Sequence, residues 1–272
     1  WITEGKIGTY SIVIIDEAHE RSKNIDLILA LIKNELLKYP HLKLIISSAT
    51  IDADSFVNYY GEITKTKLLD FSDCQKTYGY DEDPWSWNNL AKEEIAFEQT
   101  EQIEKEAEKY LKSYEKNISQ KVAKKVLDIL KKTKEGGILG FLHGKREIEN
   151  CIEQINNSIK GRRDLRVFPL YAQLGQREID MACAEFTKSD MANIEGKRIL
   201  PRRIVIATNI AETSITFKDI VWVVDSGLIK QTEWNPETER QELRTRFHSK
   251  DGCKQRWGRA GRVQKGYVYK LY

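Results

Sequence analysis

The chain has 272 residues, of which 40% are hydrophobic and 31% are charged, and its formal net charge at pH 7 is +3. This length suffices for one large hydrophobic core or two of ordinary size, and we expect two. No apolar run reaches about eighteen residues, and the N-terminal WITEGKIG lacks the pattern of a signal peptide, so membrane insertion and export are not expected. We predict a soluble intracellular protein, cytoplasmic or nuclear, without a membrane partner.

Short β-rich runs alternate with helical patterns along the chain. Several runs are apolar on both faces, which is typical of strands buried between helices in a mainly parallel sheet. Apolar residues at helical spacing, such as Ile25, Leu29, Ile32 and Leu36, predict the helices between the runs. The pattern therefore predicts an α/β fold with strands at residues 11–15, 42–47, 137–142, 166–171, 202–208, 220–225 and 266–272.

The composition changes between about residues 72 and 116. Turn formers, aromatic residues and an acidic DED run come first, and a long charged segment with helical character follows. We interpret residues 73–116 as a linker with a charged helical insertion, either an exposed arm, which we favour, or a docking site. An amphipathic pattern restarts at Ile118, so the predicted domains are residues 1–72 and 117–272.

The cysteines are widely scattered and form no CxxC pair. This spacing argues against a zinc site and favours reduced thiols in the core or at the surface. The residues concerned are Cys74, Cys151, Cys183 and Cys253.

Two carboxylates, Asp16 and Glu17, come directly after the apolar run 11–15. Ligands of open parallel sheets bind beyond the carboxyl ends of the strands, where side chains converge. At such an edge one carboxylate can hold Mg²⁺ while the other orients and deprotonates a water molecule aimed at a phosphate. Two adjacent acids alone would more often mark a helix N-terminus, which also favours negative charge.

The acids belong to a series of motifs that occur in the order SIVIIDEAHERS, LKLIISSATIDADSF, TNIAETSITF and QRWGRAGR. This series resembles that of the DEAH-box helicases of superfamily 2 over residues 1–70 and 117–272. The resemblance implies two RecA-like domains that close around ATP, or another nucleoside triphosphate, and Mg²⁺. It also implies RNA helicase activity, in which hydrolysis drives 3′ to 5′ movement along single-stranded RNA. Asp16 and Glu17 would then be the Mg²⁺-binding and water-activating acids.

The resemblance implies roles for further residues of the first domain. His19 would link the nucleotide site to the second domain. Ser48 and Thr50 of SSAT match the motif that couples hydrolysis to strand movement, and Thr3 matches a motif that contacts nucleic acid.

In the second domain, the resemblance implies nucleotide contacts from a serine, a phenylalanine and an arginine-rich motif. Ser214 matches a residue that senses the γ-phosphate. Phe186, in the helical pattern EIDMACAEF, matches a residue that stacks on the base, although a phenylalanine on a helix is usually a core residue. Guanidinium groups stabilise charge spread over phosphoryl oxygens, which independently supports a role for the arginines. The matching residues of QRWGRAGR are Gln255, Gly258, Arg259 and Arg262.

Other residues of the second domain match contacts with nucleic acid. Thr208 and Asn209 match positions that touch the backbone. The segment 228–250 resembles the family's β-hairpin, which lies near the point of strand separation. Contacts from its cations would give salt-dependent, largely sequence-independent affinity. These cations are Lys230, Arg244 and Arg246.

Some features depart from the family pattern. No phosphate-binding loop of the form GxxxxGK[ST] precedes the DEAH motif, so we expect a truncated chain that is inactive by itself. His143 stands where the family usually has threonine, which removes a hydroxyl group that would bond the backbone. Trp257 stands where a small residue is common.

Two other functions stay open. A helicase-derived module without activity would bind RNA or a protein partner. A DNA-directed helicase of the same superfamily would share the motifs that face the phosphates. An activating protein partner is a further candidate for either helicase.

Overall fold

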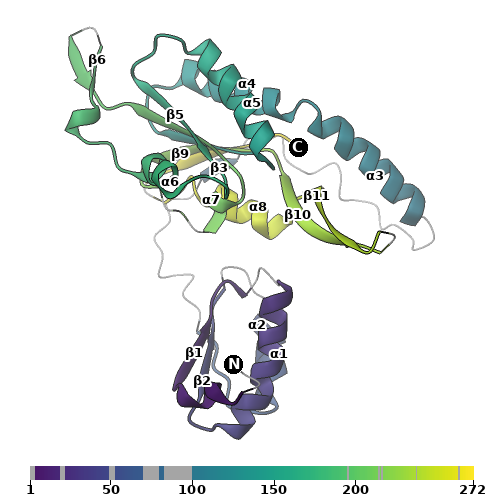
Figure 1. The fold of residues 1–272 in the computed structure, drawn as a ribbon. Helices are drawn as coiled ribbons and strands as arrows, with labels where there is room; N and C mark the ends of the chain where they lie inside the picture. The colour runs from purple at the N-terminus through teal and green to yellow at the C-terminus, as the bar shows by residue number, and fades with distance from the viewer. Residues whose placement is uncertain are drawn as a thin grey trace. The chain divides into compact units, whose positions relative to one another are not determined.

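The computed structural model describes residues 4–18, 22–48, 53–69, 80–82, 100–194, 196–213, 215, 217–236, 238–262 and 264–272. The chain forms two compact units, Trp1–Lys76 and Thr77–Tyr272, each with its own hydrophobic core (Figure 1). The segment predicted as a linker therefore falls almost wholly in the second unit. None of the helices within the described ranges has the length and hydrophobicity of a transmembrane span.

The first unit contains a pair of parallel strands joined by a helix. Helix α1 covers the apolar positions that predicted it, and it begins where Ser22 Oγ accepts a hydrogen bond from the Ile25 backbone N–H. In chain order the elements are η1 (Lys6–Thr9), β1 (Ile12–Ile15), α1 (Lys23–Lys38), β2 (Lys43–Ile46) and α2 (Ala53–Gly61). The buried core includes Ile7, Ile15, Leu29, Ile32, Leu42 and Tyr60.

In the described part of the second unit, the main sheet has six strands, and every neighbouring pair is parallel. The strand order is β3-β12-β9-β4-β8-β5. Each β-rich run predicted after residue 130 forms one of these strands. The bounds are β3 (Tyr80–Glu82), β4 (Gly137–Phe141), β5 (Leu165–Leu170), β8 (Arg202–Ala207), β9 (Ile220–Asp225) and β12 (Gly266–Lys270).

Helices cover both faces of this sheet (Figure 1). Successive strand residues point to opposite faces, so Ile138 packs in the core with α4 and α5 while Leu139 packs in the core with α6 and α8. The predicted α/β fold with a mainly parallel sheet is therefore confirmed. The helices are α4 (Ile118–Lys132), α5 (Lys145–Ser158), α6 (Gln176–Cys183), α7 (Ile210–Thr213) and α8 (Lys250–Trp257).

Among the described residues of this unit, two antiparallel hairpins accompany the sheet. The hairpin of β10 (Leu228–Asn235) and β11 (Arg240–Phe247) occupies the segment for which one was expected. A smaller hairpin of β6 (Ala192–Ile194) and β7 (Lys197–Ile199) was not predicted, and it follows the short 3₁₀ helix η5 (Lys188–Asp190).

Helix α3 (Thr100–Glu115) forms within the charged segment, but its C-terminal end is not an exposed arm. Leu111 and Tyr114 are 8% and 6% exposed and belong to the core of the second unit. The Tyr114 hydroxyl donates to the Ser226 carbonyl oxygen at 2.8 Å, and burial is the main cause that raises the pKa of this phenol. The favoured interpretation of an exposed arm was wrong for this end of the helix. Its apolar side chains pack in a core formed by residues that are distant in the sequence.

Candidate functional site

The carboxyl end of β1 holds the two acids of the DEAH motif. Asp16 is exposed and Glu17 is half-buried. One oxygen of Asp16 accepts hydrogen bonds from the Glu17 backbone N–H at 2.9 Å and from the Ser47 hydroxyl. Ser47 follows β2, and its backbone N–H donates to the Ile15 carbonyl at 2.9 Å. The ends of both strands are therefore fixed to each other at the acids.

Glu17 adopts a left-handed backbone conformation with a φ of 54°. This region is unfavourable for a residue with a side chain, by about 1–2 kcal/mol, and such residues cluster at functional sites. The next residue, Ala18, is fully buried, and its N–H donates to the Ser47 carbonyl at 3.1 Å. These contacts hold the strained residue in place.

The donor set at this strand end fits Mg²⁺. Mg²⁺ prefers oxygen ligands and is usually held by one or two carboxylates together with water and substrate phosphates. The Asp16 carboxylate offers such oxygen ligands, and the hydrogen bonds from Glu17 and Ser47 fix its orientation. Asp16 is the residue best placed to hold the ion, since it lies at the exposed end of the strand.

Ser47 was not among the residues singled out in the sequence. The register of the parallel pair, in which Ile15 lies opposite Ile46, places Ser47 beside Asp16. A predicted pairing of the two runs would have found it. Ser48, predicted to belong to the motif that couples hydrolysis to strand movement, is half-buried. Further predicted residues lie outside the described residues, namely Thr3, His19, Thr50 and Ser214.

In the second unit, the arginine-rich motif is built around a fully buried arginine, Arg256. Its Nε donates to Glu212 at 2.6 Å, and its Nη1 donates to Asp225 at 3.0 Å and to the Leu228 carbonyl at 3.1 Å. Trp257 also donates to Asp225, at 2.9 Å. Helix α8 is thereby fixed to α7 and to the end of β9.

Arg256 was missed in the sequence, although a signal for it existed. The buried residues Cys253 and Trp257 stand four apart in α8, so the face that carries them also carries Arg256. Its guanidinium lies over the ring of Phe141, 5.0 Å from the centroid. A buried arginine paired with two carboxylates serves the structure of the motif rather than contact with solvent.

The other residues of the motif occupy different environments. Gln255 is half-buried, and Gly258 ends α8 with its N–H donating to the Lys254 carbonyl at 2.9 Å. Arg259 is 4% exposed, and its Nη1 donates to the Ile215 carbonyl at 2.7 Å. Arg262 is exposed. The structure therefore distinguishes a buried arginine, bonded to the Ile215 carbonyl, from an arginine at the surface.

Thr208 and Asn209 lie directly after β8, at the start of α7. The Thr208 N–H donates to the Leu170 carbonyl at 2.9 Å, and the Asn209 carbonyl accepts from Glu212 at 2.9 Å. Thr208 is half-buried and Asn209 is exposed. Both residues therefore lie at the carboxyl edge of the sheet, as their position after a strand predicts.

Phe186 lies outside the helix in which it was predicted. Helix α6 ends at Cys183, and the Arg203 guanidinium donates to the Ala182 and Ala184 carbonyls at its end. The helical pattern was misread because these backbone groups bond a buried arginine instead of continuing the helix. Phe186 is half-buried, with the Arg203 guanidinium 4.5 Å from its ring centroid.

The predicted cations of the hairpin β10–β11 are each paired with a carboxylate. Lys230 lies 3.4 Å from Glu147. Arg244 bonds Glu242 at 2.8 Å and Arg246 bonds Glu233 at 2.7 Å, and these hydrogen bonds lower the pKa of both carboxyl groups. Contact with a nucleic-acid backbone would have to exchange these partners for phosphates. The role of these cations in binding nucleic acid stays a prediction, and the charge of each is balanced by a carboxylate.

The first unit carries two acids at the end of a parallel strand, and the second unit carries an arginine-rich motif at the end of a helix. These features place the protein among the helicase-like α/β proteins. Residues 121–264 match the family model described as the helicase conserved C-terminal domain. The chain belongs to the DEAH-box helicases of superfamily 2, as the motif series predicted.

Known proteins resemble nearly the whole chain. The chain is 33% identical over 263 residues to the ATP-dependent RNA helicase HrpA of Borreliella burgdorferi. The matched segment covers 97% of this chain and 27% of the relative. The crystal structure of the Escherichia coli DExH-box NTPase HrpB matches with a TM-score of 0.69 at 26% identity, over 99% of this chain and 28% of the other. A structure described as the DEAH/RHA helicase HrpB of the same bacterium gives a TM-score of 0.68 at 26% identity, over 99% of this chain and 29% of the other.

The chain spans only part of each relative. It covers 18%, 27% and 35% of the lengths of three curated relatives that it matches.

Proposed function

We propose that the protein acts as an ATP-dependent RNA helicase, coupling Mg²⁺-dependent hydrolysis of a nucleoside triphosphate to 3′ to 5′ movement along single-stranded RNA. The name of the relative HrpA, an ATP-dependent RNA helicase, and the description of HrpB as an NTPase support this proposal. An intracellular location, in cytoplasm or nucleus, follows from a substrate of this kind.

The observation that carries the proposal is the pair of acids at the end of β1. Asp16 is the proposed ligand of Mg²⁺, which on binding neutralises charge on the phosphate oxygens. Glu17 is the proposed base: it takes a proton from the water whose oxygen bonds to the γ-phosphorus as the bond to the leaving oxygen breaks. Its strained backbone, held by contacts of Ala18 and Ser47, supports this role.

In the second unit, we propose Arg262 as the group that stabilises charge on the γ-phosphoryl oxygens. It is exposed, whereas Arg259 is buried and bonded to the Ile215 carbonyl. Gln255 and Gly258 support the same motif, and Phe186 is a proposed stacking surface for the base. An arginine that reaches a phosphate must be accessible to it, which favours Arg262.

RNA is the proposed polymer, with Thr208 and Asn209 as contacts to its backbone. The exposed amide of Asn209 lies at the carboxyl edge of the sheet, where ligands of this class of fold bind. An affinity that depends on phosphate contacts falls as salt rises.

The decisive experiment measures RNA-stimulated nucleoside triphosphate hydrolysis. It uses the 272-residue chain and the longest natural form of the protein that carries this sequence. Glu17→Gln is expected to lower turnover by at least about 10²-fold while nucleotide binding is retained, because it removes the base and keeps the shape of the side chain. Glu62→Gln, an exposed change in the same unit, is the matched control.

The outcomes separate the alternatives. Unchanged turnover in Glu17→Gln contradicts the role of that residue. If no form of the protein hydrolyses the nucleotide and RNA still binds, a non-catalytic RNA-binding module is the better account. Competition between RNA and DNA of equal length distinguishes the two polymers through the 2′-hydroxyl group.

A further inference from the structure

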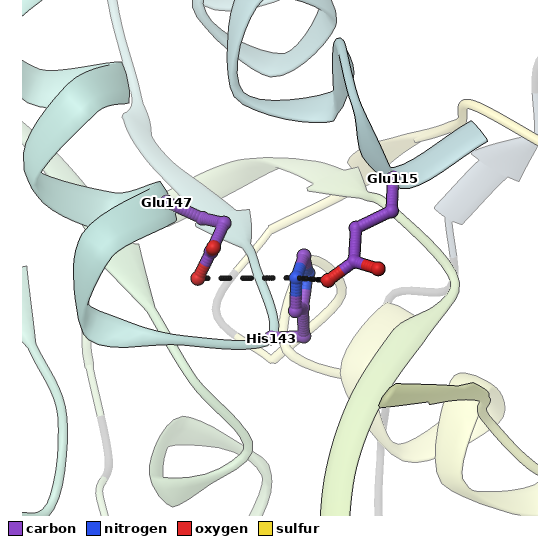
Figure 2. Close-up of side chains that lie close together, drawn as sticks. All are labelled: Glu115, His143 and Glu147. Atoms are coloured by element: carbon purple, nitrogen blue, oxygen red, sulfur yellow. Dashed lines mark hydrogen bonds and ion pairs between the residues drawn. The ribbon is translucent and has the colours of Figure 1, made fainter. Parts of the chain in front are cut away.

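A second cluster of ionisable side chains lies apart from the DEAH acids, within the second unit. Glu115 ends α3, His143 follows β4, and Glu147 lies in the first turn of α5 (Figure 2). The imidazole Nε2 lies 2.8 Å from a Glu115 oxygen and 3.8 Å from a Glu147 oxygen. One potential ligand atom from each residue lies within 4.8 Å of the others. Glu115, 28 residues before His143, therefore meets two residues of the connection from β4 to α5, and all three direct metal-ligating atoms at one point.

The burial of His143 favours a neutral imidazole. The residue is 3% exposed, and its Nδ1 has no hydrogen-bond partner among the described residues. A doubly protonated ring would bury that N–H donor without an acceptor, which is costly. In a ring with one hydrogen, Nε2 carries it and donates to the Glu115 oxygen at 2.8 Å, because a carboxylate only accepts. A metal at Nε2 would replace this hydrogen, which would move to Nδ1.

The charges around the ring favour a cation. Two carboxylates face His143, with side chains that are only 31% (Glu115) and 18% (Glu147) exposed. The ammonium of Lys230, 3.4 Å from Glu147, balances one of them. A neutral imidazole, two carboxylates and one ammonium leave a net negative charge in a half-buried position, which an additional cation would offset.

We propose that Glu115, His143 and Glu147 bind a divalent transition metal ion of the Zn²⁺ type. Imidazole nitrogen and carboxylate oxygen are common ligands of Zn²⁺, and a mixed nitrogen and oxygen set favours such metals over Mg²⁺ or Ca²⁺. Ligand atoms in a tetrahedral zinc site lie about 3.3 Å apart. The separations from Nε2 are 2.8 and 3.8 Å, and the three ligand atoms lie within 4.8 Å of one another, so the side chains would draw closer together around one ion.

The surroundings of the cluster are shaped for it. Thr245 of β11 donates to the same Glu115 oxygen at 3.0 Å, which orients the carboxylate. Gly144 leaves the space that the site needs: a Cβ there would lie 2.6 Å from the Lys230 ammonium and would overlap the Glu147 carboxylate. Lys230 is the group that the metal displaces from Glu147.

The metal would link helix α3 to the body of the second unit. Glu115 is the last residue of α3, next to the buried Tyr114. The other two ligands flank the connection from β4 to α5, and Thr245 and Lys230 belong to the hairpin β10–β11. Metal binding would therefore fix the end of α3 against this connection and beside the hairpin. The scattered cysteines have no part in the site, so their spacing does not bear on it.

Isothermal titration of the metal-stripped 272-residue chain with ZnCl₂ tests the site directly, and Co²⁺ serves as a spectroscopic probe. We expect one equivalent of Zn²⁺ to bind. Glu115→Gln and Glu147→Gln, which keep the side-chain shape, should each weaken binding by about tenfold or more, since even indirect contacts to a metal are worth that much. Glu149→Gln, an exposed change on the same helix, is the matched control. Circular dichroism shows whether each variant remains folded.

A fourth variant distinguishes this geometry from binding elsewhere. Lys230→Met should tighten Zn²⁺ binding, because it removes the ammonium that competes for Glu147. The Co²⁺ complex should show visible d–d bands without the near-ultraviolet band of a thiolate ligand. The proposal is overturned if the wild-type chain binds no stoichiometric metal, if both glutamine variants bind it as the control does, or if a thiolate band appears.

Discussion

Ile14 in β1 and Leu139 in β4 both belong to apolar parallel strands, yet 64% of Ile14 is exposed whereas Leu139 is fully buried. In the described residues, β4 has a neighbouring strand on each side and helices over both faces. β1 pairs with β2, and its Val13 and Ile15 pack on the core beside α1. The alternate residues Ile12 and Ile14 face away from that core.

The difference in burial suggests that the residues that stabilise the fold are distinct from those that carry out the chemistry. The second unit holds long buried strands and a buried ion-pair network, which resist local unfolding. The first unit has a smaller described core, but it carries the exposed acids and the strained backbone at Glu17. Mutations of buried residues should therefore change the free energy of unfolding of their own unit, and mutations of exposed site residues should change the rate of hydrolysis.

The largest loss of stability is expected from Arg256→Ala in the second unit. This change leaves the Glu212 and Asp225 carboxylates buried without their cation, which typically costs about 3–5 kcal/mol. Hydrogen exchange measured by mass spectrometry should show faster exchange in α7, α8 and β9, with β1 and β2 unchanged. Equal loosening of both units would contradict the separation.

A matched pair of core substitutions tests the burial of the strands themselves. Leu139→Ala should lower the free energy of unfolding of the second unit by about 2–5 kcal/mol, since it removes a fully buried side chain. Ile14→Ala should change stability by about 0.5 kcal/mol or less, because its side chain is mostly exposed. Urea denaturation followed segment by segment with hydrogen exchange measures both. A large cost for Ile14→Ala would mean that another surface covers it.

Whereas Arg256→Ala should affect stability, Arg262→Ala should affect hydrolysis and not stability. The residue is exposed, so the variant should keep its stability and slow RNA-stimulated hydrolysis by at least about 10²-fold if it stabilises the γ-phosphoryl charge. Steady-state hydrolysis at saturating RNA, in the natural form of the protein that turns over, is the measurement. A fall in RNA affinity alone, with an unchanged maximal rate, would assign Arg262 to the RNA backbone.

The strands and the family could be predicted because their signals are local. The runs at 137–142, 202–208 and 220–225 are apolar on both faces, and each became a strand of the buried sheet within about one residue of its predicted bounds. The DEAH motif and QRWGRAGR identify the family by residue order. Neither kind of signal depends on contacts between distant segments.

What escaped prediction depends on such contacts. The role of Arg256 needs Glu212 and Asp225, from α7 and β9, to meet α8. Docking of α3 needs the carbonyl groups of Ser226 and Leu271, and the early end of α6 needs Arg203. β1 is buried on one face and β4 on both, although both runs are apolar. Burial of the second face depends on the neighbouring elements and not on the strand itself.

The smallest expected effect concerns pH and the hairpin β10–β11, which shares the exposure of the first unit: Leu243 is 66% and Trp234 54% exposed. Hydrogen bonds from Arg246 and Arg244 hold the pKa of Glu233 and Glu242 below their ordinary value of 4.5. A carboxyl group with a depressed pKa in the folded state stabilises the fold above its unfolded pKa, and the stabilisation is lost as the pH falls through the folded value.

Protection factors of the hairpin amides, which correct for the intrinsic pH dependence of exchange, should therefore stay constant from neutral pH to about 5 and decline below about 4. Both ion pairs are partly exposed, so the decline should be modest and should shrink in high salt. The double variant Glu233→Gln and Glu242→Gln should begin with lower protection at neutral pH and lose the decline. β4, whose buried strand contains no titratable side chain, is the internal reference within the same unit. Constant hairpin protection in the wild-type chain down to about pH 3 would mean that solvent screens both pairs, and that the hairpin is held by its backbone ladder alone.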